Sequence, residues 1–323
     1  YFLHGSADEP QELTSTPEAQ PADFASLVPA GVDFTPGMSE ADSGKAAHDG
    51  WPYGYLADLR SCPTDGREVV TLNYTCAGDG AGLVAHALVD AGDEVILGTN
   101  LAVRPAKEDD GEVDKHRRAF AMVRRHGGAS AFATVIEPTR GEVQIVAVRA
   151  LQLPNAVRAV EVEFASSRRD LALLGPAGVE VQWQGETVSA NAELVLLSRD
   201  ADGVSRAVVV AGTLTWGAVS LDAPVAEHGL IAVNREAKTL TVAGTFAPAV
   251  GSLVTLDHAG ERVSAYTIAS VAADGDNTRI EITGDPGFEW DAAEQTSAFA
   301  YVPHTSYTGA HVMRQRTVVR GGE

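Results

Sequence analysis

The sequence predicts an all-β protein: a large antiparallel β-sandwich followed by a small β-barrel or sandwich module. Short runs that alternate apolar and polar residues recur about every ten residues between turn signals, a spacing typical of antiparallel sandwiches. Sustained helical periodicity is scarce. The best helical candidate, KEDDGEVDKHRRAFAMVRR, is interrupted by Gly111, and we interpret it as a charged loop that enters a strand.

The expected strands begin at the first residue. Tyr1–His4 is expected to form a strand closed by Gly5, and it needs a partner strand because an unpaired aromatic edge invites aggregation. Residues 24–50 are rich in Gly, Pro, Ala and Asp and predict a loop. The strands expected next are YGYLADLR, EVVTLNYT, GLVAHALVD, EVILGTN, AFAMVRR, SAFATVIEP, VQIVAVRAL, AVRAVEVEF, DLALLG, VEVQWQG, AELVLLSRD and SRAVVVAGT.

The alternation becomes tighter from Gly229, which indicates a second, smaller module. Hairpin turns are expected at NREAKT, HAGER and ADGDN, with about five or six short strands between and around them. We therefore place the large sandwich at 1–222, the small β module at 223–303, and a C-terminal strand and surface tail at 304–323.

Charge and hydropathy exclude two classes of partner. The chain carries 24 Lys and Arg against 44 Asp and Glu, a net charge of -20, which disfavours nucleic acid because phosphate binding needs a positive surface. No run approaches the roughly 20 apolar residues that span a bilayer, so no membrane span is expected.

The two cysteines, Cys62 and Cys76, allow two interpretations. If the strands that flank PTDG bring them together in an oxidising compartment, a disulfide would contribute roughly 3 kcal/mol. Alternatively, they are unconnected thiols. Neither cysteine indicates a metal site, because no CxxC spacing or nearby His pair accompanies them.

No self-sufficient catalytic motif is present in the sequence. There is no GxGxxG that opens a helix, no Walker loop, no HExxH and no GxSxG. The best candidate for ligand contact is the stretch HRRAFAMVRRH, with Arg117, Arg118, Arg124 and Arg125 between His116 and His126. Such arginines either bind a carboxylate or sulfate, or balance the acidic loop KEDDGEVD just before them.

Other side chains suggest contact with a sugar. His4 follows the first strand, where it either faces a cleft or has no functional role. The aromatic residues of WPYGYL and HTSYTGAH stand on turns, where a ring either stacks on a pyranose or covers the sandwich core.

Several of these stretches together resemble the C-terminal β region of the heparinase II/III-like polysaccharide lyases. The stretches are YFLHGSADE, GYLADLR and above all AFAMVRRHGGASAFATVIEP, and the resemblance covers roughly residues 1–215. In that family a Y-F-x-H-G strand precedes an RR-x-G-x-S-x-F-x-x-V-x-E-P strand pair. The second pattern is matched here, with one additional residue between Gly127 and Ser130, by Arg124, Arg125, Gly127, Ser130, Phe132, Val135, Glu137 and Pro138.

The resemblance implies a secreted or periplasmic enzyme that cleaves uronate-containing anionic polysaccharides by β-elimination. Its helical toroid, its base and acid, and a divalent metal such as Zn or Ca where one is used would lie upstream of Tyr1. The resemblance therefore implies no catalytic residue and no cofactor in this chain, a scaffold role for the arginine and Glu-Pro strand pair, and a cleft-facing position for Tyr1 and His4. The chain alone is then expected to be inactive and poorly soluble.

Two alternatives to a lyase stay open. A uronate C5-epimerase shares the proton abstraction at C5 and uses a related fold. A non-catalytic carbohydrate-binding or structural β module requires no reacting group at all. The net charge of -20 is unfavourable for a polyanionic substrate, so attraction to one must come from a local group such as the Arg124 and Arg125 cluster.

Overall fold

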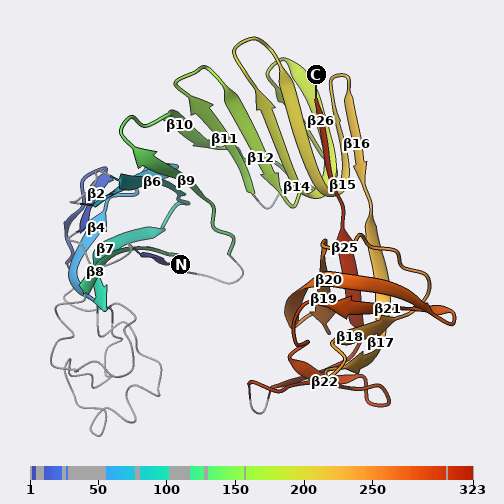
Figure 1. Ribbon diagram of the computed structural model, residues 1–323. Helices are drawn as coiled ribbons and strands as arrows, with labels where there is room; N and C mark the ends of the chain where they lie inside the picture. The colour runs from blue at the N-terminus through green and yellow to red at the C-terminus, as the bar shows by residue number, and fades with distance from the viewer. Residues whose placement is uncertain are drawn as a thin grey trace, which may run out of the picture. The chain divides into compact units, whose positions relative to one another are not determined.

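The computed structural model describes residues 2–4, 11–23, 27, 56–76, 81–101, 117–126, 130–155, 158–302 and 305–322. All regular structure in these residues is β-strand, which confirms the all-β prediction (Figure 1). The chain divides into two compact units. Unit 1 comprises Tyr1–Leu173 and Ser198–Ser205, and unit 2 comprises Leu174–Leu197 and Arg206–Glu323.

Unit 1 contains two antiparallel sheets that share a core. The first has the order β1 (Phe2–His4), β8 (Arg117–Arg124), β7 (Glu94–Leu101), β4 (Ala57–Cys62) and β3 (Gln20–Pro21). The second has the order β2 (Gln11–Thr16), β5 (Val69–Cys76), β6 (Ala81–Leu88) and β9 (Thr134–Arg140).

The core between these two sheets has the composition of a sandwich interior. Alternate residues of β5 and β6 point inward and meet alternate residues of β7 and β8, because side chains of a strand alternate between its two faces. Val70, Leu72, Val95 and Leu97 are fully buried there. The first strand has the partner that its aromatic sequence requires, since Phe2 pairs with Met122 in β8.

A further sheet has the order β10 (Ile145–Ala150), β11 (Arg158–Phe164), β12 (Arg169–Leu174), β14 (Glu186–Arg199), β15 (Ser205–Trp216) and β16 (Val219–Ala223). In addition, β13 (Val179–Trp183) pairs with β14, and β26 (Val318–Gly322) pairs with β15. The strands of this sheet match most of the runs expected between 143 and 213.

Unit 2 also contains a closed six-stranded barrel. Its order is β17 (Val225–Asn234), β18 (Thr239–Val242), β21 (Asn277–Ile282), β20 (Arg262–Asp274), β19 (Leu253–His258) and β25 (His311–Arg316). The hairpins expected at NREAKT, HAGER and ADGDN are confirmed as the turns between β17 and β18, β19 and β20, and β20 and β21.

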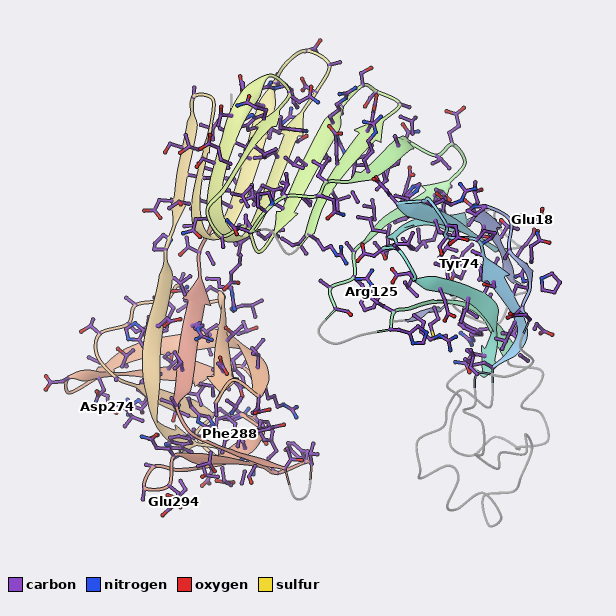
Figure 2. The ribbon with its side chains drawn as sticks, turned by 180° about the vertical axis from the view of Figure 1, so that it is seen from behind. Glu18, Tyr74, Arg125, Asp274, Phe288 and Glu294 are labelled. Atoms are coloured by element: carbon purple, nitrogen blue, oxygen red, sulfur yellow. The ribbon has the colours of Figure 1, made fainter. Side chains whose placement is uncertain are left out.

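A small sheet adjoins the barrel core. It consists of β22 (Phe288–Asp291), β23 (Thr296–Phe299) and β24 (Ser306–Thr308). Phe288 is fully buried and belongs to the same apolar cluster as Leu240, Leu256 and Met313 of the barrel (Figure 2). The small sheet therefore packs onto the barrel core.

The C-terminal boundary differs from the expectation. Residues 304–323 were expected to form a strand and a surface tail, but β24, β25 and β26 lie in this stretch. Strand β25 closes the barrel by pairing with both β17 and β19, so the module does not end at 303. The sequence hides this because strand pairing is set by register with distant strands.

The large domain expected at 1–222 is likewise not one compact body. Strands β13, β15 and β16, which lie within that range, belong to unit 2 together with the barrel. Continuous strand spacing from β4 to β16 does not reveal this division, because spacing alone does not show which sheet each strand joins.

Candidate functional site

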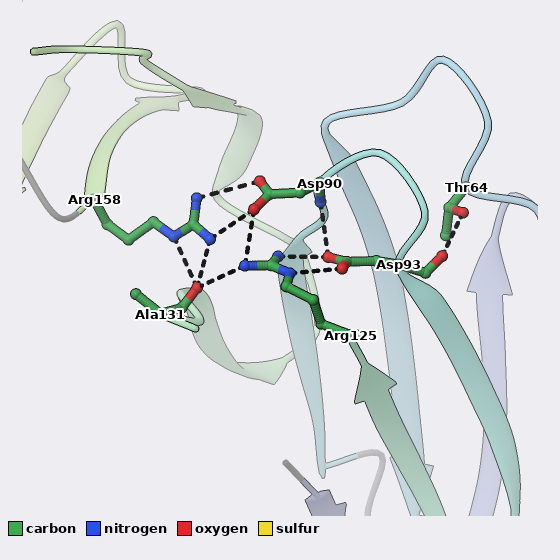
Figure 3. Close-up of polar contacts among 6 residues, drawn as sticks. All are labelled: Thr64, Asp90, Asp93, Arg125, Ala131 and Arg158. Carbon is green, nitrogen blue, oxygen red and sulfur yellow. Dashed lines mark hydrogen bonds and ion pairs between the residues drawn. The ribbon is translucent and has the colours of Figure 1, made fainter. Parts of the chain in front are cut away.

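Arg125, the central residue of the sequence-based ligand site, lies in a network of ion pairs in unit 1 (Figure 3). It follows β8, and its guanidinium donates to Asp93 through Nε to Oδ1 at 2.7 Å and through Nη2 to Oδ2 at 2.5 Å. Its Nη1 also donates to the carbonyl oxygen of Ala131 at 3.1 Å and lies 2.8 Å from Asp90 Oδ2. The Arg125 fork is thus directed into the protein.

Arg158, the first residue of β11, completes this network from the other side of Asp90. Its Nη1 and Nη2 donate to the two Asp90 carboxylate oxygens at 3.2 and 2.9 Å, and its Nε donates to Ala131 O at 2.9 Å. Two arginines therefore share one carboxylate and one carbonyl oxygen. The network joins three segments: the loop from β6 to β7, the stretch between β8 and β9, and the start of β11.

The turn that carries Asp90 and Asp93 is built by local hydrogen bonds. The Asp90 amide donates to Asp93 Oδ2 at 2.8 Å, and Thr64 Oγ1 donates to the Asp93 carbonyl oxygen at 2.8 Å. Gly92 adopts a φ of 84°, a conformation that glycine reaches without steric cost. The D-A-G-D sequence therefore forms the tight turn that aims Asp93 at Arg125.

Burial makes this ion pair different from a surface pair. The Asp93 side chain is 0% exposed and that of Arg125 is 14% exposed. Burial alone would raise the pKa of Asp93, but the hydrogen bonds and charge of Arg125 outweigh it and hold the pKa below its ordinary value. The same hydrogen bonds raise the pKa of Arg125, so both groups are charged at neutral pH.

Arg124 is paired in a more exposed position. Its Nε donates to Glu94 Oε2, which also lies 3.7 Å from His126 Nε2. The Arg124 hydrogen bond holds the pKa of Glu94 below its ordinary value. The ion pairing expected for this arginine stretch is thus present, but the carboxylates come from Asp90, Asp93 and Glu94, while the loop KEDDGEVD lies outside the described residues.

The remaining motif residues have structural contacts. The Arg125 guanidinium lies over the Phe132 ring, 4.9 Å from its centroid. Glu137 is buried and accepts hydrogen bonds from the backbone amides of Gln144 and Ile145 at 2.5 and 3.2 Å, which holds the start of β10. Pro138 lies in β9, an edge strand of its sheet, where a missing backbone donor is tolerated.

The other expected ligand contacts lie outside what the structure describes. Tyr1 and His116 are outside the described residues, and for His4 and Arg117 the structure describes the backbone alone. His4 is the last residue of β1 and pairs with Phe120 of β8. A cleft-facing position for Tyr1 and His4 remains a prediction.

The disulfide alternative for Cys62 and Cys76 is contradicted. Cys62 is a buried free thiol whose Sγ lies 3.3 Å from Ser15 Oγ, and burial raises its pKa. The register explains why. Ser15, which contacts Cys62, pairs with Leu72 of β5, whereas Cys76 pairs with Gln11 at the start of β2. Gln11 and Ser15 are four residues apart, which is roughly 13 Å along a strand. The two cysteines therefore end strands of different sheets at different places.

A second polar cluster, which the sequence analysis missed, lies inside unit 2. His258 of β19 and His311 of β25 pair across the barrel wall, and their exposed fractions are 0% and 3%. Ser297 of β23 lies between them, 3.1 Å from His258 Nδ1 and 2.8 Å from His311 Nε2. We call His258, Ser264, Ser297 and His311 the histidine relay.

One fixed acceptor orients the histidine relay. His311 Nδ1 lies 2.8 Å from the Gly309 carbonyl oxygen, which only accepts, so Nδ1 donates to it. Ser297 Oγ bridges His311 Nε2 and His258 Nδ1, and Ser264 Oγ lies 3.1 Å from His258 Nε2.

The surroundings of His258 keep its ring neutral at neutral pH. Burial, together with the neighbouring His311 and Arg262, lowers the pKa of His258 to about 4, while Asp257 acts in the opposite direction. Trp290, Phe288 and Phe299 pack around the two imidazoles. The relay joins the small sheet to the barrel, and its buried position gives it a structural role. The isolated histidines of DHAG and GAHV were the only sequence signal for it.

In the described residues, no group of three or more His, Cys, Asp and Glu side chains is arranged to hold a metal ion. Among the same residues there is also no helix of the length and hydropathy that a membrane crossing needs. Compared with known protein families, with curated proteins and with solved structures, the chain matches none.

Proposed function

We propose that this chain is the all-β scaffold of a polysaccharide lyase that acts on uronate-containing anionic glycans. The observation that supports the proposal is that residues of the arginine and Glu-Pro strand pair make structural contacts. The Arg125 guanidinium lies over the Phe132 ring and donates to the Ala131 carbonyl oxygen, and Glu137 accepts from the backbone amides at the start of β10. Such contacts fit a scaffold role.

The chemistry of the whole enzyme is β-elimination. A base removes the proton at C5 of the uronate, the electron pair moves into the C5 carboxylate system as an enolate, and the 4-oxygen leaves with a proton from an acid. Arg124 and Arg125 are paired with carboxylates of the chain, so we propose no catalytic role for them. As the resemblance implies, we propose that the base and the acid lie upstream of Tyr1. We also propose a secreted or periplasmic location, where such glycans are found.

The test uses the full polypeptide that contains this chain, incubated with alginate, pectate and glycosaminoglycans. The expected result is a rise in ultraviolet absorbance from the unsaturated uronate at the new non-reducing end. A change of configuration at C5 without chain cleavage, seen by nuclear magnetic resonance, would assign the chain to an epimerase instead. No change in any uronate glycan would refute both enzyme classes.

A further inference from the structure

An exposed tyrosine ring is held in place on unit 2 by its hydroxyl group. Tyr301 follows β23, its residue is 73% exposed, and its hydroxyl donates to Asp285 Oδ2 at 2.6 Å. Asp285 lies between β21 and β22. The ring is therefore anchored at its polar tip, while most of its apolar surface faces solvent.

Two more charged side chains complete this arrangement. Arg235, in the turn between β17 and β18, donates to both Asp285 carboxylate oxygens at 3.0 and 2.6 Å. Its third nitrogen donates to Glu289 Oε1 at 2.8 Å, and its guanidinium carbon lies 5.6 Å from the Tyr301 ring centroid. We call Arg235, Asp285, Glu289 and Tyr301 the Tyr301 cluster.

The orientation of these groups is fixed before any ligand arrives. The Gly287 amide donates to Asp285 Oδ1 at 2.8 Å, in addition to the bonds from Arg235 and Tyr301. These hydrogen bonds hold the pKa of Asp285 well below its usual range and raise that of Tyr301, so at neutral pH the carboxylate is charged and the hydroxyl keeps its proton. A pre-oriented site loses less entropy on binding.

A contribution to fold stability explains the Arg235–Asp285 ion pair, but it does not explain the exposed Tyr301 ring. The bidentate pair between Arg235 and Asp285 joins the β17–β18 turn to the segment before β22 without help from Tyr301. An aromatic ring that is 73% exposed buries little apolar surface, yet holding it still costs side-chain entropy. The hydroxyl bond and the nearby Arg235 guanidinium orient the ring, while the residue stays 73% exposed, so apolar ring surface remains open to a ligand.

The chemistry of the cluster is complementary to a pyranose. The C–H groups on one face of a pyranose pack on an aromatic ring, while the hydroxyls at its rim donate to carboxylates. Glu289, whose side chain is 69% exposed, offers acceptor oxygens beside the ring. One guanidinium against two carboxylates gives the cluster a net negative charge, which repels a uronate.

We propose that the Tyr301 cluster binds an uncharged pyranose residue of a glycan, with the sugar stacked on Tyr301 and its hydroxyls bonded to Glu289. This binding function goes beyond the proposed scaffold role and does not depend on any cleavage of uronate glycans. It assigns unit 2 a glycan-binding role.

The test measures binding of the fluorescently labelled chain to immobilised oligosaccharides of glucan, mannan, galactan, alginate and pectate. The wild-type chain is expected to bind at least one uncharged series. Tyr301→Ala should weaken that binding at least about tenfold, because it removes the stacking surface. Tyr301→Phe keeps the ring but loses the anchor, and Glu289→Gln weakens one acceptor, so each should reduce affinity by about threefold.

The control is Leu253→Ala, which removes another exposed apolar side chain of the same unit, one that is 63% exposed and outside the cluster. It should bind like the wild type. The thermal unfolding of each variant shows whether it folds. If Tyr301→Ala does not fold, Tyr301→Phe and Glu289→Gln still test the proposal.

Failure of the wild-type chain to bind any uncharged series, or equal binding by the folded cluster variants, would overturn the proposal. The lyase assay is independent of this result. Binding without uronate cleavage by the full polypeptide refutes the lyase alone, and cleavage without cluster-dependent binding refutes the Tyr301 site alone.

Discussion

Arg125 and Asp93 show how one ion pair fixes the local structure of unit 1. Arg125 bonds with the fully buried Asp93 and also with Asp90, so it holds the β6–β7 loop against the end of β8. A carboxylate in this position needs its partner, because an unpaired buried charge costs several kcal/mol.

We therefore predict that Arg125→Met lowers the free energy of unfolding by about 3 to 5 kcal/mol, since it leaves Asp93 buried and unpaired. The matched control is Arg149→Met, which breaks a pair with Glu161 in which the arginine side chain is 52% exposed, and it should cost less than about 1 kcal/mol. Urea unfolding measures both. Equal losses in the two variants would contradict the structural role of Arg125.

Cys62 gives a second prediction at the residue scale. Because it is a free thiol that is 3% exposed, the folded chain should react slowly with iodoacetamide, and chain unfolded without reductant should react at Cys62. Mass spectrometry of the peptides measures the labelling. A peptide pair linked through Cys62 and Cys76 in the unreduced chain would show that the register is wrong.

At the scale of elements, the sequence predicted strands better than it predicted their partners. Alternating polarity located most strands from β4 to β21, and the hairpin turns of the barrel followed from Gly, Asp and Asn. The pairing of strands that are distant in the chain could not be predicted from the sequence, because the sequence pattern of one strand does not specify its partner or register. For this reason the sequence left a Cys62–Cys76 disulfide open as an alternative, and it predicted one strand and a tail for residues 304–323.

The candidate sites show the same limit. The sequence indicated that Arg124 and Arg125 had acidic partners, but it pointed to the neighbouring acidic loop, not to the D-A-G-D-E turn about 30 residues away. The histidine relay and the Tyr301 cluster had no local motif at all, since their members come from four and three separate segments of the chain. Folding of the barrel brings the residues of each site together, so neither site forms a motif in the sequence.

The histidine relay predicts how the stability of the barrel depends on pH. The folded state holds His258 neutral with a pKa of about 4, whereas the unfolded chain takes up a proton near the ordinary value of 6.5. The unfolded state thus binds more protons between these values, so stability falls as pH falls, by about 1.4 kcal/mol per pH unit at most.

The measurement is the unfolding of the chain between pH 7 and 5, followed by tryptophan fluorescence. His258→Gln should flatten the dependence, even if it lowers stability at pH 7. The control, His228→Gln, removes a less buried histidine of β17 and should keep the slope. A slope that persists in His258→Gln would mean that other groups cause the pH dependence.

Gly212 of β15 gives a prediction for the sheet. Its φ is 150°, and a Cβ atom there would lie 2.1 Å from the Asn191 carbonyl oxygen. We expect Gly212→Ala to destabilise unit 2 by more than about 1 kcal/mol, because the clash involves backbone. Gly229→Ala, where a Cβ meets nothing within 4 Å, should change stability by less than that. Similar thermal unfolding of both variants would contradict this.

At the scale of the whole molecule, the two units serve different parts of the proposed function. Unit 1 contains Arg125, Phe132 and Glu137, for which we propose a scaffold role. Unit 2 carries the exposed Tyr301 ring, for which we propose glycan binding. The net charge of -20 is unfavourable for a uronate polymer, so any attraction of one must come from a local positive group.

The central claim is that residues 1–323 supply scaffold and binding while the reacting groups lie elsewhere. The most direct measurement compares the isolated chain with the full polypeptide in the ultraviolet assay for unsaturated uronate, on the same glycans. We predict product from the full polypeptide and none from the chain alone. Product formed by the soluble, isolated chain would contradict the claim and place the catalytic groups within these residues.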